Sequence, residues 1–404
     1  MARWALLLSS WPRAAASRPP KDVFDAHLSP SSLTQPVIDQ CVRDVSGALA
    51  WGGRAAQGPF VLTYATEIPQ PWMLGRTAAL HGLPLVVAGL GMPGWNWWEG
   101  VVIQKTASPR RAAQLVQSLV GDVPLALVDS GDVLVVNRPS GTQRRGLDRM
   151  GRTVLVGGEC NSWPICYLPW YEADADGRRC LEARGACMPN GGVTIARSST
   201  LIDFLRAWRV AGEATLASSN AAERGNDQSA LHHLYANRSK FPSLTIHVDW
   251  ASRFSLQLWT CKGGAKGGPL RRPRGGPFEY CHHATHEPLR RVAVSADGTE
   301  VAFNESREAR GGRAQHPIFI HSNGYHFRLK DPVFAPMLAR QDERQLPTQL
   351  FDQPVLLVES YLEGKFRPCS VCSLGWLSNQ TRYPRGGESP RTVSGGATGS
   401  PSLC

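Results

Sequence analysis

The sequence lacks several features that would each place it in a familiar class. No apolar run reaches the roughly 20 residues that a membrane-spanning helix needs, so we expect no transmembrane span. No Cys-x-x-Cys pair is followed by a histidine pair at zinc-finger spacing, which argues against structural zinc. No internal repeat is present, so a repeat architecture is not expected.

Nucleic-acid recognition also lacks its usual signals. The net charge is +11, but much of it lies in Gly/Pro/Arg-rich segments such as residues 143–152 and 262–274, which have the composition of solvated loops. No basic strand with interleaved aromatic residues and no recognition helix accompanies this charge. We therefore expect no nucleic-acid partner, and predict only a general attraction for acidic or phosphate-bearing ligands.

Cysteine is plentiful, with ten residues in the chain. In the absence of zinc spacing we expect disulfides, and these pairs are candidates: Cys160 with Cys166, Cys180 with Cys187, Cys261 with Cys281, and Cys369 with Cys372. Asn-x-Ser/Thr sequons stand at Asn237, Asn304 and Asn379, as in a glycoprotein. Both features favour an oxidising compartment.

The first residues carry one positive charge, a short apolar core and then small residues at 14–17. This pattern fits a short signal peptide, and it also fits a transit sequence or an inaccurate gene start. Together with the cysteines it leads us to predict a lumenal location in the ER or Golgi, or secretion.

Strand and helix signals alternate through the first half of the chain. Strands are predicted over residues 60–65, 83–90 and 125–129, and helices over 71–81 and 109–120. The last of these helices has Ser108 as its candidate N-cap and a proline in its first turn. Such alternation predicts an α/β fold with a mostly parallel sheet.

Composition divides the chain into predicted parts. Residues 1–58 form an N-terminal targeting or irregular segment with a short helix near 37–48, and 59–330 form the main domain, with Cys-rich and Gly/Arg-rich loop insertions. Residues 331–382 form a C-terminal extension that holds a Cys-x-x-Cys motif. Residues 383–404 are rich in Gly, Ser, Pro and Arg and are expected to be disordered.

The most informative stretch is an apolar run at residues 125–128 that ends in Asp129 and Asp132. A buried parallel strand reads as such a run, and ligands in open α/β sheets bind beyond the carboxyl ends of the strands. Ser130 and Gly131 are small and leave room for a ligand, so Ser130 is a candidate binding residue. Two carboxylates on a short loop suit Mg²⁺ or Mn²⁺, which can hold a diphosphate. The alternative is an Asx-type turn that merely closes the strand.

Ordered short motifs extend this reading: residues 63–67 (Thr-Tyr-Ala-Thr-Glu), 88–91 followed by Trp97, 104–105, 128–133, Glu159 with 163–164, 227–228, Asp249, and 321–324 (His-Ser-Asn-Gly). In this order they resemble the glycosyltransferase domain at the N-terminus of procollagen lysyl hydroxylases. That domain is a nucleotide-sugar transferase of the GT-A type. The resemblance covers residues 59–330, with a fainter echo at 369–372.

The resemblance implies a GT-A fold and an Mn²⁺-dependent (or Mg²⁺-dependent) glycosyltransferase. Its donor would be a UDP-hexose, and its acceptor a hydroxylated side chain of a protein or a glycan already attached to one. The implied metal ligands are Asp129, Asp132 and His321. Carboxylates combined with an imidazole suit Mn²⁺, which accepts mixed oxygen and nitrogen ligands.

The resemblance also assigns donor-binding residues. Those implied to lie at the nucleotide or its diphosphate are Thr63, Ala65, Thr66, Trp97, Lys105, Asn323 and Gly324. Trp97 (or Trp98) would stack on uracil or line the sugar pocket. Lys105 would meet phosphate, and the backbone of residues 323–324 would donate hydrogen bonds to it.

Further residues are implied at the transferred sugar. Gly191 and Gly192 would allow the backbone to approach the donor closely. Asp227 and Gln228 would face the sugar as catalytic residues, with Asp227 as the base or orienting carboxylate. The family's longer acidic run is reduced here to Asp227, and its Asn-Ser-Gly-Gly becomes Pro-Asn-Gly-Gly at residues 189–192. These departures leave open a transferase-like protein that binds without catalysing.

A second alternative comes from another class. His247, Asp249, His321 and Arg328 mimic the ligands and the 2-oxoglutarate-binding arginine of an Fe(II)/2-oxoglutarate oxygenase. An oxygenase of this kind is an all-β barrel. The strand-helix alternation of residues 60–135 therefore argues against it.

Overall fold

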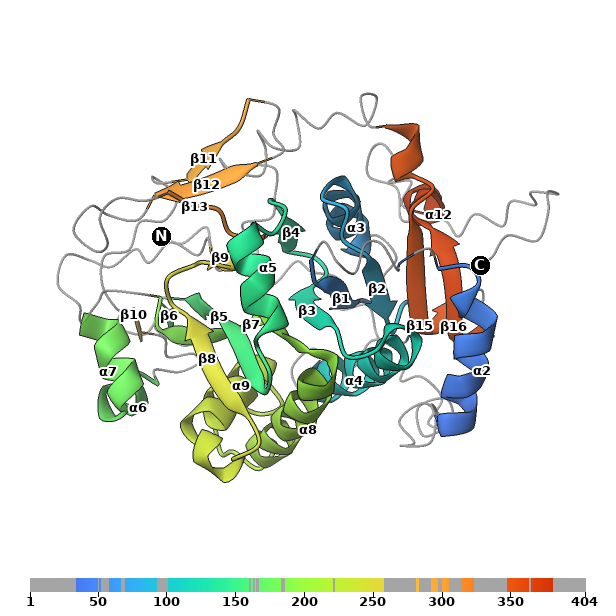
Figure 1. Cartoon of the computed structure of the whole chain (residues 1–404). Coiled ribbons are helices and arrows are strands. Elements are labelled where there is room, and N and C mark those ends of the chain that lie inside the picture. Colours follow the sequence, from blue (N-terminus) through green and yellow to red (C-terminus); the bar gives the residue numbers. More distant parts are fainter. Residues whose placement is uncertain are drawn as a thin grey trace, which may run out of the picture.

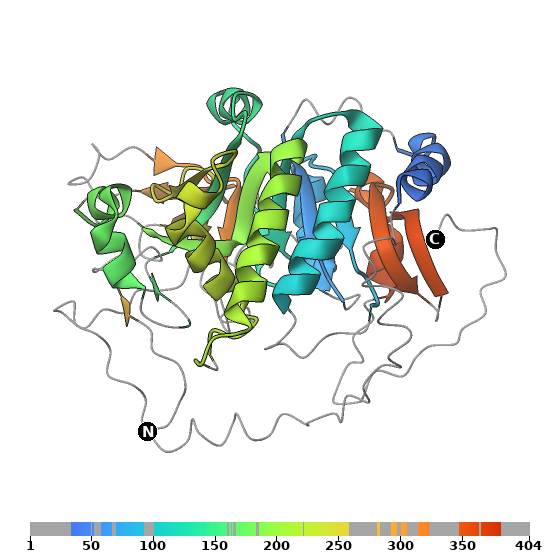
Figure 2. The same ribbon diagram turned by 90° about the horizontal axis from the view of Figure 1, so that it is seen from below.

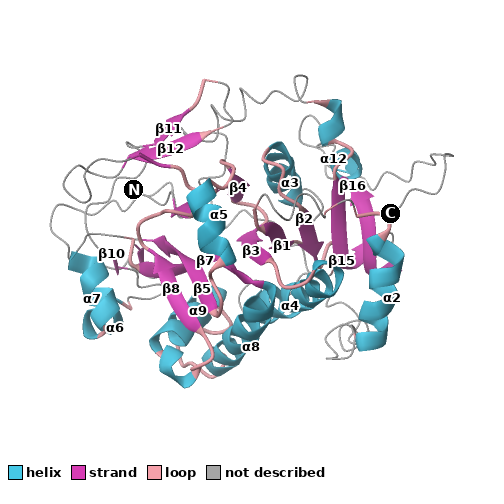
Figure 3. Ribbon diagram, in the orientation of Figure 1, coloured by secondary structure: helices cyan, strands magenta, loops and turns pink. Residues whose placement is uncertain are grey.

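A computed structural model describes a large part of the chain. The described residues are 34–49, 51, 58–66, 70–92, 101–159, 161–162, 164, 167–182, 186–220, 222–257, 281–282, 292–296, 300–304, 314–322, 347–362 and 365–380. Helices lie on both sides of a large sheet (Figures 1 and 3). The predicted α/β class is therefore confirmed.

The large sheet has eight strands among the described residues. In spatial order they are β16 (Lys365–Ser373), β15 (Pro354–Leu362), β2 (Leu85–Ala88), β1 (Phe60–Tyr64), β3 (Pro124–Asp129), β7 (Met188–Arg197), β5 (Thr153–Glu159) and β8 (Thr245–Asp249). β7 and β16 run antiparallel to their neighbours, and the other strands share one direction. The sheet is thus mixed, and its arrangement is compatible with a Rossmann-like fold.

The strands are apolar at consecutive positions because both faces of the sheet are covered. Phe60 and Leu62 point to one face, where they join a core with α2 (Gln35–Ser46), α4 (Val101–Val120), α8 (Ser198–Thr215) and α9 (Asp227–Ala236). Val61 points to the other face, towards α3 (Gln70–Leu80) and α12 (Leu374–Gln380). Figure 2 shows α4 and α8 side by side across the sheet.

α4 begins earlier than the sequence predicts. We expected a helix from residue 109 with Ser108 as its N-cap, but the helix starts at Val101 and contains Pro109. The turn before the proline is packed inside the protein, where Lys105, Thr106 and Ser108 are buried. Tertiary burial therefore outweighs the local tendency of a helix to start at proline.

A second, smaller sheet stands at the carboxyl end of β3. Its order is β4 (Val133–Val135), β14 (Phe319–His321) and β9 (Ser255–Gln257), with β14 antiparallel to β4 and parallel to β9. It separates the large sheet from a three-stranded sheet of β11 (Val292–Val294), β12 (Val301–Asn304) and β13 (Ala314–Gln315). Residues 130–132 carry the chain from β3 to β4.

The remaining described elements surround these sheets. They are α5 (Gly141–Asp148), α6 (Leu168–Ala173), α7 (Ala175–Glu182), the short pair β6 (Asn161–Ser162) and β10 (Cys281–His282), and the 3-10 turns η2 (Arg238–Lys240) and η6 (Thr348–Leu350). No helix within the described ranges combines the length and apolarity needed to cross a membrane.

The disulfides agree with the sequence only in part. Cys180 is bonded to Cys187, as predicted. Cys369, however, is bonded to Cys41 of α2 and not to Cys372, which is itself disulfide-bonded. α2 packs beside β16, so residues far apart in sequence come together there. The side chains of Cys160, Cys166, Cys261 and Cys281 lie outside the described residues.

The C-terminal extension is continuous with the main domain. Within residues 331–382, β15 pairs in parallel with β2, β16 pairs with β15, and α12 packs against α3. In the segment 1–58, α2 matches the helix expected near 37–48. Residues 383–404, expected to be disordered, lie outside the described residues.

Candidate functional site

Asp129 and Asp132 stand on either side of a short loop. Asp129 is the last residue of β3, and Asp132 immediately precedes β4. Their side chains are 31% and 24% exposed, so both can reach a ligand. The backbone N–H of Ser322 donates to the Asp132 carbonyl at 2.8 Å, which fixes this loop to the end of β14.

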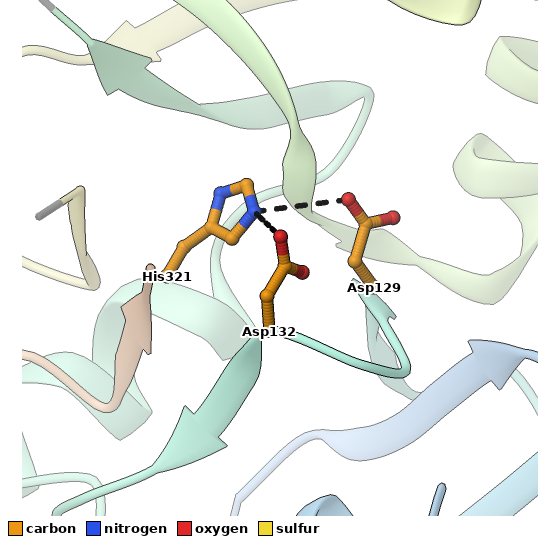
Figure 4. A group of neighbouring side chains, drawn as sticks. All are labelled: Asp129, Asp132 and His321. Carbon is orange, nitrogen blue, oxygen red and sulfur yellow. Dashed lines mark ion pairs between the residues drawn. The ribbon is translucent and has the colours of Figure 1, made fainter. Parts of the chain in front are cut away.

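His321 reaches the same place from the other end of the chain. It is the last residue of β14, opposite Val133 of β4, and it is 3% exposed. Its Nε2 lies 3.2 Å from Asp132 Oδ2 and 3.8 Å from Asp129 Oδ2. Figure 4 shows the three side chains pointing towards one another. One ligand atom from each residue lies within 4.8 Å of the others, which is the spacing of a metal site.

The chemistry of these groups fits a divalent cation. Both ring nitrogens of His321 are buried without a hydrogen-bond partner, although Nε2 is close to Asp132. Burial lowers the pKa of His321, but Asp132 and Asp129 raise it by more, so the net pKa is higher than that of a free imidazole. The ring therefore lies in a field that attracts positive charge, and a bound cation would supply that charge in place of the imidazole proton.

Gly192 in β7 makes room for the imidazole. A Cβ at this position would overlap the Cε1, Nδ1 and Nε2 atoms of His321. The Gly192 N–H donates to Asn190 Oδ1 at 2.7 Å, which holds this part of the strand in place. The sequence predicted the close approach of a donor sugar at Gly192, and the structure shows the close approach of a candidate ligand side chain.

Lys105 of α4 lies between two carboxylates. Its Nζ is 2.5 Å from Asp129 Oδ1 and 2.7 Å from Asp227 Oδ2, and it is 5.7 Å from the centroid of the Trp208 ring. Burial lowers the pKa of Lys105, but the two aspartates raise it by a larger amount, so the net pKa is above that of a free lysine. The ammonium group is therefore charged and joins the candidate metal site to α9.

Asp227 and Gln228 occupy the first turn of α9. Asn226 caps this helix by accepting from the Ser229 N–H at 3.0 Å. Gln228 is buried, accepts from the Gly191 N–H at 3.0 Å, and donates to Glu159 Oε1 at 3.1 Å. Of the predicted sugar-site residues, Gly191 is thus bonded to Gln228 and Gly192 lies against His321, whereas Asp227 is linked to Asp129 through Lys105.

Two residues had no assigned role in the sequence analysis. Trp208 of α8 lies against Lys105, and its Nε1 donates to the Asp227 carbonyl at 3.0 Å. Its position on an apolar helix face gave no signal beyond a core residue. Glu159 ends β5, is 5% exposed, and adds its negative charge to the surroundings of His321. Glu159 was among the motifs of the resemblance but was given no role there.

The predicted nucleotide-binding residues at the end of β1 are mostly enclosed. Thr63 is fully buried, and its hydroxyl donates to the Val128 carbonyl at 2.7 Å. Ala65 is buried, whereas Thr66 is partly exposed and its carbonyl accepts from Gly91. Ser130 is partly exposed beside the metal cluster. Trp97, Asn323 and Gly324 lie outside the described residues.

The oxygenase triad is not assembled. Asp249 is buried, and its carboxylate accepts from the backbone N–H groups of Arg253, Phe254 and Ser255 at 2.9, 2.7 and 2.8 Å. This carboxylate therefore closes a turn, and the side chain of His247 is exposed. Of the residues that the structure describes, only Asp129, Asp132 and His321 form a group with metal-ligand spacing. Arg328 lies outside the described residues.

No family model and no curated protein matches this sequence. Any functional assignment therefore depends on the geometry and chemistry of the site.

Proposed function

We propose that this protein is a metal-dependent glycosyltransferase with a GT-A fold. It moves a hexose from a UDP-sugar to a hydroxylated side chain of a protein, or to a glycan attached to one. The observation that carries this proposal is the convergence of Asp129, Asp132 and His321 at the carboxyl ends of β3 and β14. In open α/β sheets this edge is where nucleotides bind.

The donor set favours Mn²⁺ over a cation that accepts only oxygen ligands. Two carboxylates and one imidazole combine hard oxygen donors with a nitrogen donor. When bound, Mn²⁺ would act as a Lewis acid that neutralises charge on the UDP leaving group. Asp129 and Asp132 supply two negative charges, and their partial exposure leaves them open to a diphosphate-bound ion.

The residues beside the metal cluster would receive the sugar in this proposal. Gln228 holds Gly191 in β7, and Asp227 follows the N-cap of α9, on the helix that stands next to this strand. Asp227 is the candidate base or orienting carboxylate for the acceptor hydroxyl. Disulfides stabilise the protein in an oxidising compartment, and we propose that it acts in the secretory lumen or is secreted.

Donor turnover tests the proposal directly. The purified full chain is offered a panel of UDP-hexoses with and without Mn²⁺, and the release of UDP is measured. We expect release from at least one donor only when Mn²⁺ is present. Asp132→Asn should abolish it, whereas Asp148→Asn, which changes an exposed acid on α5, should leave it unchanged.

Two other outcomes separate the alternatives. Binding of UDP with Mn²⁺ but without turnover of any donor would identify a transferase-like binding protein. Equal turnover by the wild type and Asp132→Asn would refute the metal assignment.

A further inference from the structure

The Lys105 ammonium already has two close carboxylate partners. It is enclosed by protein, with 9% of its side chain exposed, and it contacts Asp129 at 2.5 Å and Asp227 at 2.7 Å. The single positive charge of this ammonium is shared between two carboxylates, so little of it is left to attract a phosphate. The expected phosphate contact of Lys105 therefore needs another interpretation.

The two carboxylate oxygens of Asp129 face different groups, one the Lys105 ammonium and the other the candidate metal site. Oδ1 contacts Lys105, and Oδ2 faces Nε2 of His321. A cation bound by Asp129, Asp132 and His321 therefore shares the Asp129 carboxylate with the ammonium. Like charges this close repel each other strongly in a partly buried site, so Lys105 reduces the affinity of the site for a cation.

The same ammonium also holds the Asp227 carboxylate. Without Lys105, the carboxylates of Asp129 and Asp227 would face each other across the site without a neutralising charge. The Trp208 ring lies against the Lys105 ammonium, and the Nε1 of the same ring donates to the Asp227 carbonyl. Trp208 therefore contacts both members of the Lys105–Asp227 pair. Because Lys105 contacts both carboxylates, a change in the charge on Asp129 alters the interaction of Lys105 with Asp227.

We propose that Lys105 is a positioning residue that couples occupancy of the Asp129–Asp132–His321 site to the Asp227 carboxylate. When a cation binds, it draws the Asp129 charge to itself, and Lys105 is left to neutralise Asp227. Empty and filled sites therefore differ in how firmly Asp227 is held by the lysine. This inference rests on the proposed function only in assigning Asp227 a role in the reaction; the coupling itself concerns cation binding.

The coupling is tested by the Mn²⁺ affinity of the full chain, without any donor sugar. Mn²⁺ is titrated, and free Mn²⁺ is followed by its electron paramagnetic resonance signal. Lys105→Met removes the charge and keeps much of the chain length, and we expect it to bind Mn²⁺ at least about tenfold more tightly than the wild type. Lys105→Arg keeps the charge and should stay within about threefold. Lys240→Met makes the same change at an exposed site beyond the far end of α9 and should have no effect.

Tighter metal binding is a result that a purely structural lysine would not produce, because loss of packing weakens a site. Unchanged or weaker Mn²⁺ binding in folded Lys105→Met would overturn the coupling. If that variant fails to fold, Asp227→Asn provides the second measurement. This variant removes no metal ligand, but it leaves Asp129 as the one of these two carboxylates that pairs with the Lys105 ammonium. Mn²⁺ affinity should therefore fall about tenfold. An unchanged affinity would likewise overturn the coupling.

The two proposals fail in different ways. A wild type that binds no Mn²⁺ refutes the metal-dependent transferase as well as the coupling. A wild type that binds and uses Mn²⁺, beside a Lys105→Met variant of the same affinity, refutes the coupling alone. If both proposals hold, Lys105→Met at saturating Mn²⁺ should show a lower kcat, with Lys105→Arg recovering part of it.

Discussion

Arg111 of α4 and Glu359 of β15 form a buried, bidentate ion pair. Nη2 of Arg111 lies 2.6 Å from Glu359 Oε2, Nε contacts Oε1, and both residues are less than 5% exposed. Glu359 also has a φ of 52°, which a glutamate adopts only when its surroundings require it. This pair ties the C-terminal strands to the helix that carries Lys105.

Breaking this pair on one side should destabilise the protein strongly. Glu359→Ala leaves the Arg111 charge buried without its carboxylate, and we expect a loss of about 3–5 kcal/mol in the free energy of unfolding. The measurement is denaturant unfolding, with Glu172→Ala on the surface of α6 as the control. Arg111→Met combined with Glu359→Leu should recover most of the loss, since no buried charge remains. A loss below about 1 kcal/mol for Glu359→Ala would contradict the assignment.

Gly192 is predicted to be essential for metal affinity although it offers no ligand atom. Gly192→Ala places a methyl group where the His321 ring now lies, so the ring must move away from Asp132. Loss of such a supporting contact typically lowers metal affinity by about 10- to 100-fold. Mn²⁺ titration provides the measurement.

Gly131→Ala is the matched control for this substitution. Gly131 lies in the loop between the two aspartates, yet a Cβ there would meet nothing within 4 Å, and its φ is not positive. It should therefore bind Mn²⁺ as the wild type does. Equal affinities for Gly192→Ala and Gly131→Ala would show that His321 is not a ligand.

Much of the site could be read from the sequence because it depends on local patterns. An apolar strand that ends in Asp129 and Asp132 fixes where those carboxylates stand, since strand ends in α/β proteins have a defined edge. His321 was assigned as a ligand only through the family resemblance, because a histidine at a strand end does not by itself indicate a metal site. The resemblance alone assigned Lys105 to phosphate, and nothing local in α4 reveals that Asp227 lies against it, 122 residues later.

The parts that the sequence did not reveal depend on distant contacts. The apolar run at 354–358 lies beyond the expected end of the main domain, and only its pairing with β2 shows that it belongs to the same sheet. The Cys41–Cys369 bond spans 328 residues, whereas the alternative partner Cys372 was three residues away. Spacing favours the nearby cysteine, but the packing of α2 against β16 decides the pairing.

His81, which follows α3, should make the protein sensitive to mild acid. Burial lowers the pKa of His81 to about 4, with a smaller contribution from Arg138, and its Nε2 has no hydrogen-bond partner. Below pH 6.5, His81 therefore binds a proton in the unfolded chain, whereas in the folded protein it stays neutral until the pH approaches about 4. Stability should fall as the pH drops from about 6.5 to about 4, by up to about 3 kcal/mol from this residue.

The test compares the pH dependence of unfolding in His81→Gln with that of the wild type. The variant lacks the titrating ring, so its free energy of unfolding should fall less between pH 6.5 and pH 4. His247→Gln changes an exposed histidine and should keep the wild-type slope. Parallel pH profiles for His81→Gln and the wild type would show that His81 titrates normally.

Mn²⁺ should stabilise the folded protein by mass action. An ion that binds the folded state alone adds about 2.7 kcal/mol when its free concentration is 100 times the Kd, and this raises Tm. We expect the rise to disappear in His321→Gln, because the remaining carboxylates lie on one loop and lose the ligand from β14. His316→Gln, an exposed position five residues earlier, should retain it. Since the unfolded chain does not bring residues 129 and 321 together, a Tm rise of equal size in His321→Gln would mean that Mn²⁺ binds elsewhere.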